Sequence, residues 1–151
     1  MAVYGFNDDK TKADLSGLNG YELLGTNSGT FSPGYESSPT RIGNLSDIAA
    51  NYSKVVLVIG LKTSSNQRMN IAGQIEYPTD LLKPRQSQNE QIGETSMITA
   101  GGFDREQNYR TDAILEIETD GSIYIKRWAS GNTGSFNYTY SKAFLFGIKR
   151  I

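Results

Sequence analysis

The chain has 151 residues, of which 37% are hydrophobic and 21% are charged, and its formal net charge is −1. This size and composition are typical of one globular domain and exclude a disordered tail or a chain built mainly of membrane spans. Cysteine and histidine are both absent, which excludes disulfides, thiolate nucleophiles, Ser-His-Asp triads and the commonest zinc ligand.

The charge pattern and the apolar runs indicate where the protein works. Acids and bases are interspersed without a basic stripe, so nucleic acid is not an expected partner, and Lys126-Arg127 is interpreted as part of a solvated edge. The longest apolar run, residues 55–61, is far shorter than the about 18 residues that span a bilayer. Asp8 and Asp9 stand where the apolar core of a signal peptide would lie. We therefore expect synthesis and folding in a cytoplasm, and no membrane partner.

Two parts of the chain differ in character. Residues 1–20 are polar with two aromatics, Tyr4 and Phe6, and are interpreted as an N-terminal arm; a disordered terminus is the equal alternative. Residues 21–151 contain short apolar stretches separated by Gly, Ser, Asn and Thr clusters. Such a pattern predicts an all-β sandwich or barrel.

The first elements of the domain are short. Residues 24–38 are rich in Gly, Ser and Thr and allow one strand around Thr30. Residues 45–52 have an apolar spacing that predicts a helix of one to two turns, with Ser46 as its N-cap.

The middle of the domain predicts three strands. Residues 54–62 are apolar on both faces, which implies a cover on the second face of the sheet. Residues 68–77 alternate and should place one set of side chains on one face: Met69, Ile71, Gly73, Ile75 and Tyr77. A polar loop bracketed by Pro78 and Pro84 follows, and then a strand over residues 92–103 that breaks at Gly101-Gly102.

Residues 112–128 predict a hairpin around Thr119-Asp120-Gly121. A two-residue loop would pair Ile117 with Tyr124, whereas a three-residue loop with Gly121 in the left-handed conformation pairs Ile117 with Ile123. Because register follows the buried face, we favour the three-residue loop with a bulge. Tyr124, Lys126 and Trp128 then lie on the face opposite the core.

The chain closes with aromatic and apolar strands. Phe136, Tyr138 and Tyr140 share one strand face, and residues 143–148 are apolar on both faces. Two strands that need cover on both sides favour an oligomer; the alternative is that loops or the arm cover them. The candidate subunit-interface residues are Val56, Val58, Phe144, Phe146, Tyr138 and Tyr140.

Carboxylates are the groups left for catalysis. The closest pairs are Asp104 with Glu106 and Glu116 with Glu118. A glycosidase needs its two carboxyl groups across a sugar in a cleft with one pKa raised, so acids on an open strand face are interpreted as solvated. Neither an enzyme nor a cofactor is expected. Asn7-Asp8-Asp9 lacks the spacing of a calcium loop, so no metal site is predicted.

Aromatic side chains are better candidates for binding. Flat rings stack on the apolar faces of sugars while neighbouring polar groups fix the hydroxyls. The candidate saccharide-binding residues are Trp128, Tyr109, Asp104, Arg105, Asn108 and Asn132. The alternative interpretation is that a neighbouring subunit covers Trp128.

Three stretches resemble small structural proteins of tailed bacteriophages: YGFNDDKTKADL (residues 4–15), LSDIAANYSKVVLVIG (residues 45–60) and YSKAFLFGIKRI (residues 140–151). The last two are similar to the head domains of tail-fibre and baseplate proteins. The resemblance implies a TNF-like jelly roll, usually trimeric and displayed on the virion. It also implies a possible particle anchor at Tyr4, Phe6, Asp8 and Asp9. The chain departs from long fibres because it lacks a heptad stalk, a collagen tract or a β-helix.

These observations predict an antiparallel jelly-roll sandwich with one short helix, assembled as a homotrimer. The expected function is that of a non-enzymatic virion protein, a tail or baseplate head with a candidate saccharide ligand; the alternative is a capsid decoration protein with an architectural role. Its expected partners are its own copies and, through the arm, other virion proteins.

Overall fold

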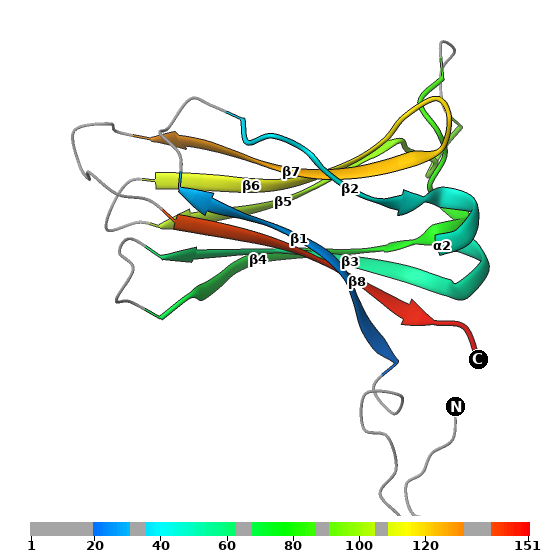
Figure 1. Cartoon of the computed structure of the whole chain (residues 1–151), viewed down its shortest axis with the longest axis horizontal. Helices are drawn as coiled ribbons and strands as arrows, with labels where there is room; N and C mark the ends of the chain where they lie inside the picture. The colour runs from blue at the N-terminus through cyan, green and yellow to red at the C-terminus, as the bar shows by residue number, and fades with distance from the viewer. Residues whose placement is uncertain (1–19, 31–35, 63–67, 87–90, 105–108, 132–139) are drawn as a thin grey trace, which may run out of the picture.

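The computed structural model describes residues 20–30, 36–62, 68–86, 91–104, 109–131 and 140–151. These residues form an all-β sandwich with one short α-helix, as predicted (Figure 1). Its elements, in chain order, are β1 (Tyr21–Thr30), β2 (Thr40–Asn44), α2 (Leu45–Asn51), β3 (Tyr52–Lys62), β4 (Asn70–Pro78), η1 (Thr79–Leu81), β5 (Met97–Asp104), β6 (Tyr109–Ile117), β7 (Ser122–Gly131) and β8 (Tyr140–Lys149).

The strands build two four-stranded antiparallel sheets that face each other (Figure 1). Sheet A has the order β1-β8-β3-β4 and sheet B the order β2-β7-β6-β5. The pairs β1·β8, β3·β8 and β2·β7 join strands far apart in the chain. The other neighbours, β3·β4, β5·β6 and β6·β7, are local antiparallel pairs.

The core lies between the sheets and is built from alternate residues of the central strands. On β3, Val55, Leu57 and Ile59 are at most 1% exposed and point to sheet B. Sheet B contributes a matching row of buried side chains: Ala113, Leu115, Ile117, Ile123 and Ile125. The residues between the inward ones on β3, Val56 and Val58, therefore occupy the outer face of sheet A.

The β6–β7 hairpin has the predicted register. Ile117 pairs with Ile123 and Leu115 with Ile125 across a loop at Thr119-Asp120-Gly121. Gly121 has a φ of 87°, a left-handed conformation that favours glycine. The alternation predicted from this register also holds, since Tyr124, Lys126 and Trp128 lie off the core while their neighbours are buried.

The helix confirms its predicted position but not its predicted cap. Asn44, not Ser46, is the N-cap, since its backbone is extended and its side chain accepts a hydrogen bond from the backbone N–H of Ser46 at 3.0 Å. Ser46 lies inside the first turn, where its hydroxyl also donates to Asn44 Oδ1. The cap of this helix is thus the last residue of β2.

A bulge in β4 overturns the predicted alternation of residues 68–77. Ile75 and Tyr77 pack on the core, whereas Ile71 is 60% exposed. The register with β3 shifts between Gly73 and Ile71, so one additional residue turns Ile71 to the other face.

Glycines bring the sheet edges at β4 and β5 together. A Cβ on Gly73 would overlap the carbonyl oxygen of Gly101, and one on Gly102 would overlap the side chain of Ala72. The predicted break at Gly101-Gly102 is therefore wrong: β5 runs through both residues. They are needed because the backbones of β4 and β5 approach closely there.

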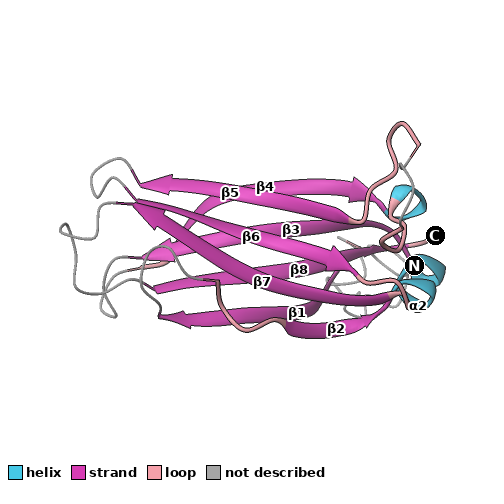
Figure 2. Ribbon diagram, turned by 90° about the horizontal axis from the view of Figure 1, so that it is seen from above, coloured by secondary structure: helices cyan, strands magenta, loops and turns pink. Residues whose placement is uncertain are grey.

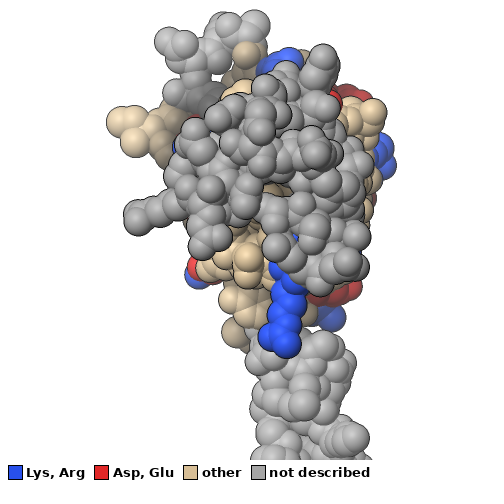
Figure 3. Space-filling view, turned by 90° about the vertical axis from the view of Figure 1, so that its left-hand side faces the viewer, with Lys and Arg blue, Asp and Glu red and all other residues tan. Residues whose placement is uncertain are grey.

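The strand ends opposite α2 gather at one end of the sandwich (Figure 1). Thr30 and Lys62 both pair with Tyr140 there, and Asp104 and Gly131 both pair with Tyr109. Figure 3 looks onto this end, where the acidic and basic side chains that are coloured lie interspersed around its margin. That arrangement agrees with the mixed charge of the sequence.

Candidate functional site

The outer face of sheet A carries a set of apolar side chains. We call it the sheet A face and define it by Tyr21, Leu23, Val56, Val58, Phe144 and Phe146. Tyr21 and Leu23 on β1 are 49% and 52% exposed. The rings of Phe144 and Phe146 on β8 stack with centroids 6.1 Å apart. Four of the predicted interface residues thus lie on one face.

A hollow of about 250 Å³ opens in this face. Val56, Val58 and Phe146 provide its apolar lining, and Tyr21, Gln74 and Glu76 complete it. Val56 and Val58 are each only 7% exposed, so they form the floor and the rings form the walls. The arrangement can accept an apolar side chain.

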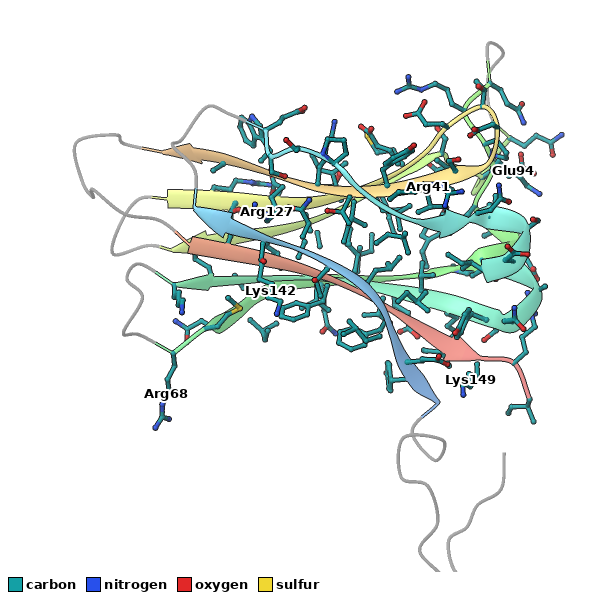
Figure 4. All side chains as sticks on the ribbon, viewed as in Figure 1. Arg41, Arg68, Glu94, Arg127, Lys142 and Lys149 are labelled. Carbon is teal, nitrogen blue, oxygen red and sulfur yellow. The ribbon has the colours of Figure 1, made fainter. Side chains whose placement is uncertain are left out.

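Charged groups stand around the sheet A face. Lys54 and Glu76 form an ion pair at 3.3 Å, with both side chains about half exposed. The ammonium of Lys142 lies 5.1 Å from the centre of the Phe144 ring, within range of a cation–π contact. Figure 4 shows Lys142 on the side of sheet A that faces away from sheet B. An apolar centre with a mixed-charge margin is the anatomy of a protein–protein interface.

A second charge cluster joins the ends of β1, β3 and β8. The ammonium of Lys149 lies 3.2 Å from Glu22 Oε2. Hydrogen bonds from Lys149 and from the Tyr52 hydroxyl lower the pKa of Glu22. Burial, together with the bond to Glu22, raises the pKa of Tyr52. A lowered carboxyl pKa means that this contact stabilises the fold above the ordinary glutamate pKa and is lost as pH falls through the lowered value.

Replacing Lys149 with methionine is expected to raise the pKa of Glu22 toward its ordinary value, because Lys149 is the largest cause of the shift. Tyr52→Phe, which removes the second hydrogen bond, should raise it by less. Carboxyl ¹³C NMR titration of Glu22 measures both changes. An unaltered Glu22 pKa in Lys149→Met would show that the ion pair is absent in solution.

The outer face of sheet B carries ion pairs interspersed among apolar and aromatic side chains, which include Met97, Tyr124 and Trp128. Lys126 Nζ lies 3.0 Å from Glu116 and 3.2 Å from Glu36. Partial burial alone would lower the pKa of Lys126, but the hydrogen bonds to these two carboxylates outweigh it and raise the pKa. Glu118 lies 3.9 Å from Arg85. Both carboxylates of the Glu116–Glu118 pair therefore have a cation beside them.

The predicted saccharide-binding residues are placed only in part. Trp128 lies on the outer face of sheet B and is partly exposed. Asp104 ends β5 and Tyr109 begins β6, so their backbones are adjacent, but their side chains are outside the described part. The remaining members of the set, Arg105, Asn108 and Asn132, lie outside the described residues.

Some of the predicted subunit-interface residues and all of the predicted anchor residues are likewise not described by the structure. Tyr140 begins β8 and its side chain is not described, and Tyr138 lies outside the described residues. The four candidate anchor residues also lie outside them: Tyr4, Phe6, Asp8 and Asp9.

Arg127 contradicts its interpretation as part of a solvated edge. It is only 4% exposed and lies between the two sheets (Figure 4). The missed signal is the alternation of β7, in which Ile123, Ile125, Arg127 and Ala129 share the core face. A buried guanidinium of this kind must be hydrogen-bonded.

Comparison with known proteins gives no relative: the chain matches no protein-family model, no curated protein and no solved structure. Among the residues that the structure describes, no three His, Cys, Asp or Glu side chains gather as a metal site. None of the helices in this part of the chain is long and apolar enough to cross a membrane.

Proposed function

We propose that this chain is a non-enzymatic structural protein that assembles with copies of itself through the sheet A face. The observation that carries the proposal is the contrast between the two outer sheet faces. On sheet A, Leu23, Phe144 and Phe146 lie together at the outer face, whereas on the outer face of sheet B ion pairs centred on Lys126 are interspersed among Met97, Tyr124 and Trp128. Contiguous apolar surface of this kind usually marks an interaction site on a soluble protein.

A second copy is the partner that the residues favour. Tyr and Phe are enriched at interface centres and charged residues at interface margins, which is how the sheet A face and its Lys54–Glu76 pair are arranged. The margin carries both signs of charge, and the chain has a net charge of only −1, so copies meet with little repulsion. A closed assembly then covers this face on each subunit.

The resemblance to small structural proteins of tailed bacteriophages supplies the setting of the proposal. The assembly would be a trimer made in the host bacterial cytoplasm and incorporated into the virion. Tyr4, Phe6, Asp8 and Asp9 would attach it to other virion proteins. Within that setting the domain serves as a tail or baseplate head, and the alternative is a capsid decoration protein.

Leu23→Glu is expected to convert a trimer into monomers, because it places a charge within the apolar surface of the proposed interface. Leu23 is 52% exposed in the single chain, so the substitution should leave the fold intact. Light scattering coupled to size exclusion measures the mass, which should be about three times 16.6 kDa for the unaltered chain.

Met97→Glu is the matched control, since Met97 is 51% exposed and lies on β5 of the other sheet. It should leave the mass of the assembly unchanged. An unaltered chain that stays at 16.6 kDa over the whole concentration range would overturn the self-assembly proposal. Dissociation by Met97→Glu but not by Leu23→Glu would place the interface on sheet B.

A further inference from the structure

A pocket of about 500 Å³ opens where β1 of sheet A and β2 of sheet B lie side by side (Figure 2). Every described residue that lines it is polar: Thr26, Asn27, Ser28, Ser37, Ser38, Thr40 and Arg127. Its volume is within the range of small-molecule sites. The pocket adjoins the sheet A face at β1, where Thr26 pairs with Phe144, but it shares no defining residue with that face.

The floor of the pocket is a buried hydrogen-bond network. Asn27 is 6% exposed and Arg127 is 4% exposed. Arg127 Nε donates to Asn27 Oδ1 at 2.6 Å, and Arg127 Nη1 donates to the carbonyl oxygens of Gly29 and Ser141. The guanidinium is thus directed at oxygens of the protein itself. Its role is to hold Asn27 in place.

Asn27 in turn orients hydroxyl groups in the wall. Its Nδ2 donates to Thr40 Oγ1 at 2.9 Å, and its Oδ1 accepts from Ser37 Oγ at 3.1 Å. Because the Thr40 oxygen accepts from Asn27, its own proton is directed elsewhere and can be donated to a ligand. Groups held in this way bind without first losing rotational freedom.

We propose that this pocket binds a saccharide through the hydroxyls of Ser38 and Thr40. Each hydroxyl of a sugar both donates and accepts, as each Ser and Thr hydroxyl does. Among the described residues, the lining contains no carboxylate to hold a hard cation and no apolar side chain to hold an apolar ligand. A compact polyhydroxylated molecule is the ligand class whose chemistry matches such a wall. The site goes beyond self-assembly and does not depend on it.

Amide chemical-shift titration of the full chain tests the site. The probes are glucose, galactose, N-acetylglucosamine and glucuronic acid, each raised to tens of millimolar. At least one sugar should shift amides at residues 26–28 and 37–40 and leave those of the sheet A face unmoved. A response to glucuronic acid alone would assign an acidic sugar, and a response to a neutral sugar would assign a neutral one.

Two variants then separate binding from structure. Thr40→Val keeps the shape but removes the oriented donor, and Ser38→Ala removes an exposed hydroxyl of the lining without touching the floor. Each should weaken the binding of the responding sugar at least tenfold with the amide spectrum otherwise retained. Thr99→Val, at an exposed position of β5, is the matched control and should bind as the unaltered chain does.

Two outcomes overturn the proposal. One is the absence of shifts at residues 26–28 and 37–40 with all four sugars. The other is binding that both Thr40→Val and Ser38→Ala leave unchanged. Since the readout is local, neither outcome bears on the mass of the assembly that tests the proposed function.

Discussion

Gly73→Ala is expected to lower the free energy of unfolding by about 3 kcal/mol, at the upper end of what overpacking costs. A Cβ at this position would overlap the carbonyl oxygen of Gly101. That obstacle is backbone and cannot rotate away, so β4 and β5 would have to separate. For a domain of this size the melting temperature should fall by roughly 6–12 °C.

Gly43→Ala is the matched control for this prediction. A Cβ there would meet only Ile48 Cδ1 at 3.8 Å, an ordinary contact. Because alanine restricts the unfolded chain, this substitution should be neutral or stabilise by up to about 1 kcal/mol. Calorimetry of the two variants decides the matter. Equal melting temperatures would mean that β4 and β5 do not approach each other as closely as the structure has them.

Where a strand pattern has one consistent buried face, the sequence predicted the structure well. The β6–β7 register follows from Ile117 and Ile123, because the alternative loop would have placed Tyr124 opposite Ile117 instead. The strands that contain Val56 and Phe144 are apolar on both faces, which predicted that their second face would need to be covered. Both residues lie on the outer face of sheet A. Such patterns can be recognised in the sequence because the polarity of each residue in a strand indicates whether its side chain is buried.

Features set by tertiary geometry were not predictable in this way. The bulge that turns Ile71 outward changes the side of each residue beyond it, and no local signal in residues 68–77 marks it. Gly101 and Gly102 were read as a strand break because the neighbouring strand that requires them is not visible in the sequence. A glycine permits both a turn and a close approach, and only the fold distinguishes the two.

The polar pocket could not have been found from the sequence. Its floor joins Asn27 to Arg127, which are 100 residues apart in the chain. Neither residue is part of a recognisable motif, and the charge of Arg127 suggested solvent exposure. The alternation of buried residues along β7 was the one indication that Arg127 is buried. To use it, one would have had to place a charged side chain on the core face of the strand.

That buried cation leads to the second large effect. Arg127→Met is expected to lower the free energy of unfolding by about 3 kcal/mol. Replacing all members of a buried polar cluster by apolar residues can be neutral or stabilising. The effect of Arg127→Met on stability therefore depends on the hydrogen-bond acceptors that the substitution leaves in place. Here Asn27 Oδ1 and the carbonyl oxygens of Gly29 and Ser141 would lose their donor from Arg127. Leaving buried acceptors without that donor costs about 1–3 kcal/mol each.

Arg85→Met is the matched control, because the Arg85 side chain is 59% exposed and its ion pair with Glu118 is 3.9 Å long. An exposed pair of this kind contributes less than about 1 kcal/mol. Urea denaturation should therefore show a large fall in midpoint for Arg127→Met, at constant slope, and little change for Arg85→Met. Arg127→Lys should fall between them, because it keeps the charge but not the several directions in which the guanidinium donates. If Arg127→Met matched Arg85→Met instead, the network would not hold the two sheets together, and the pocket above it would lack a fixed floor.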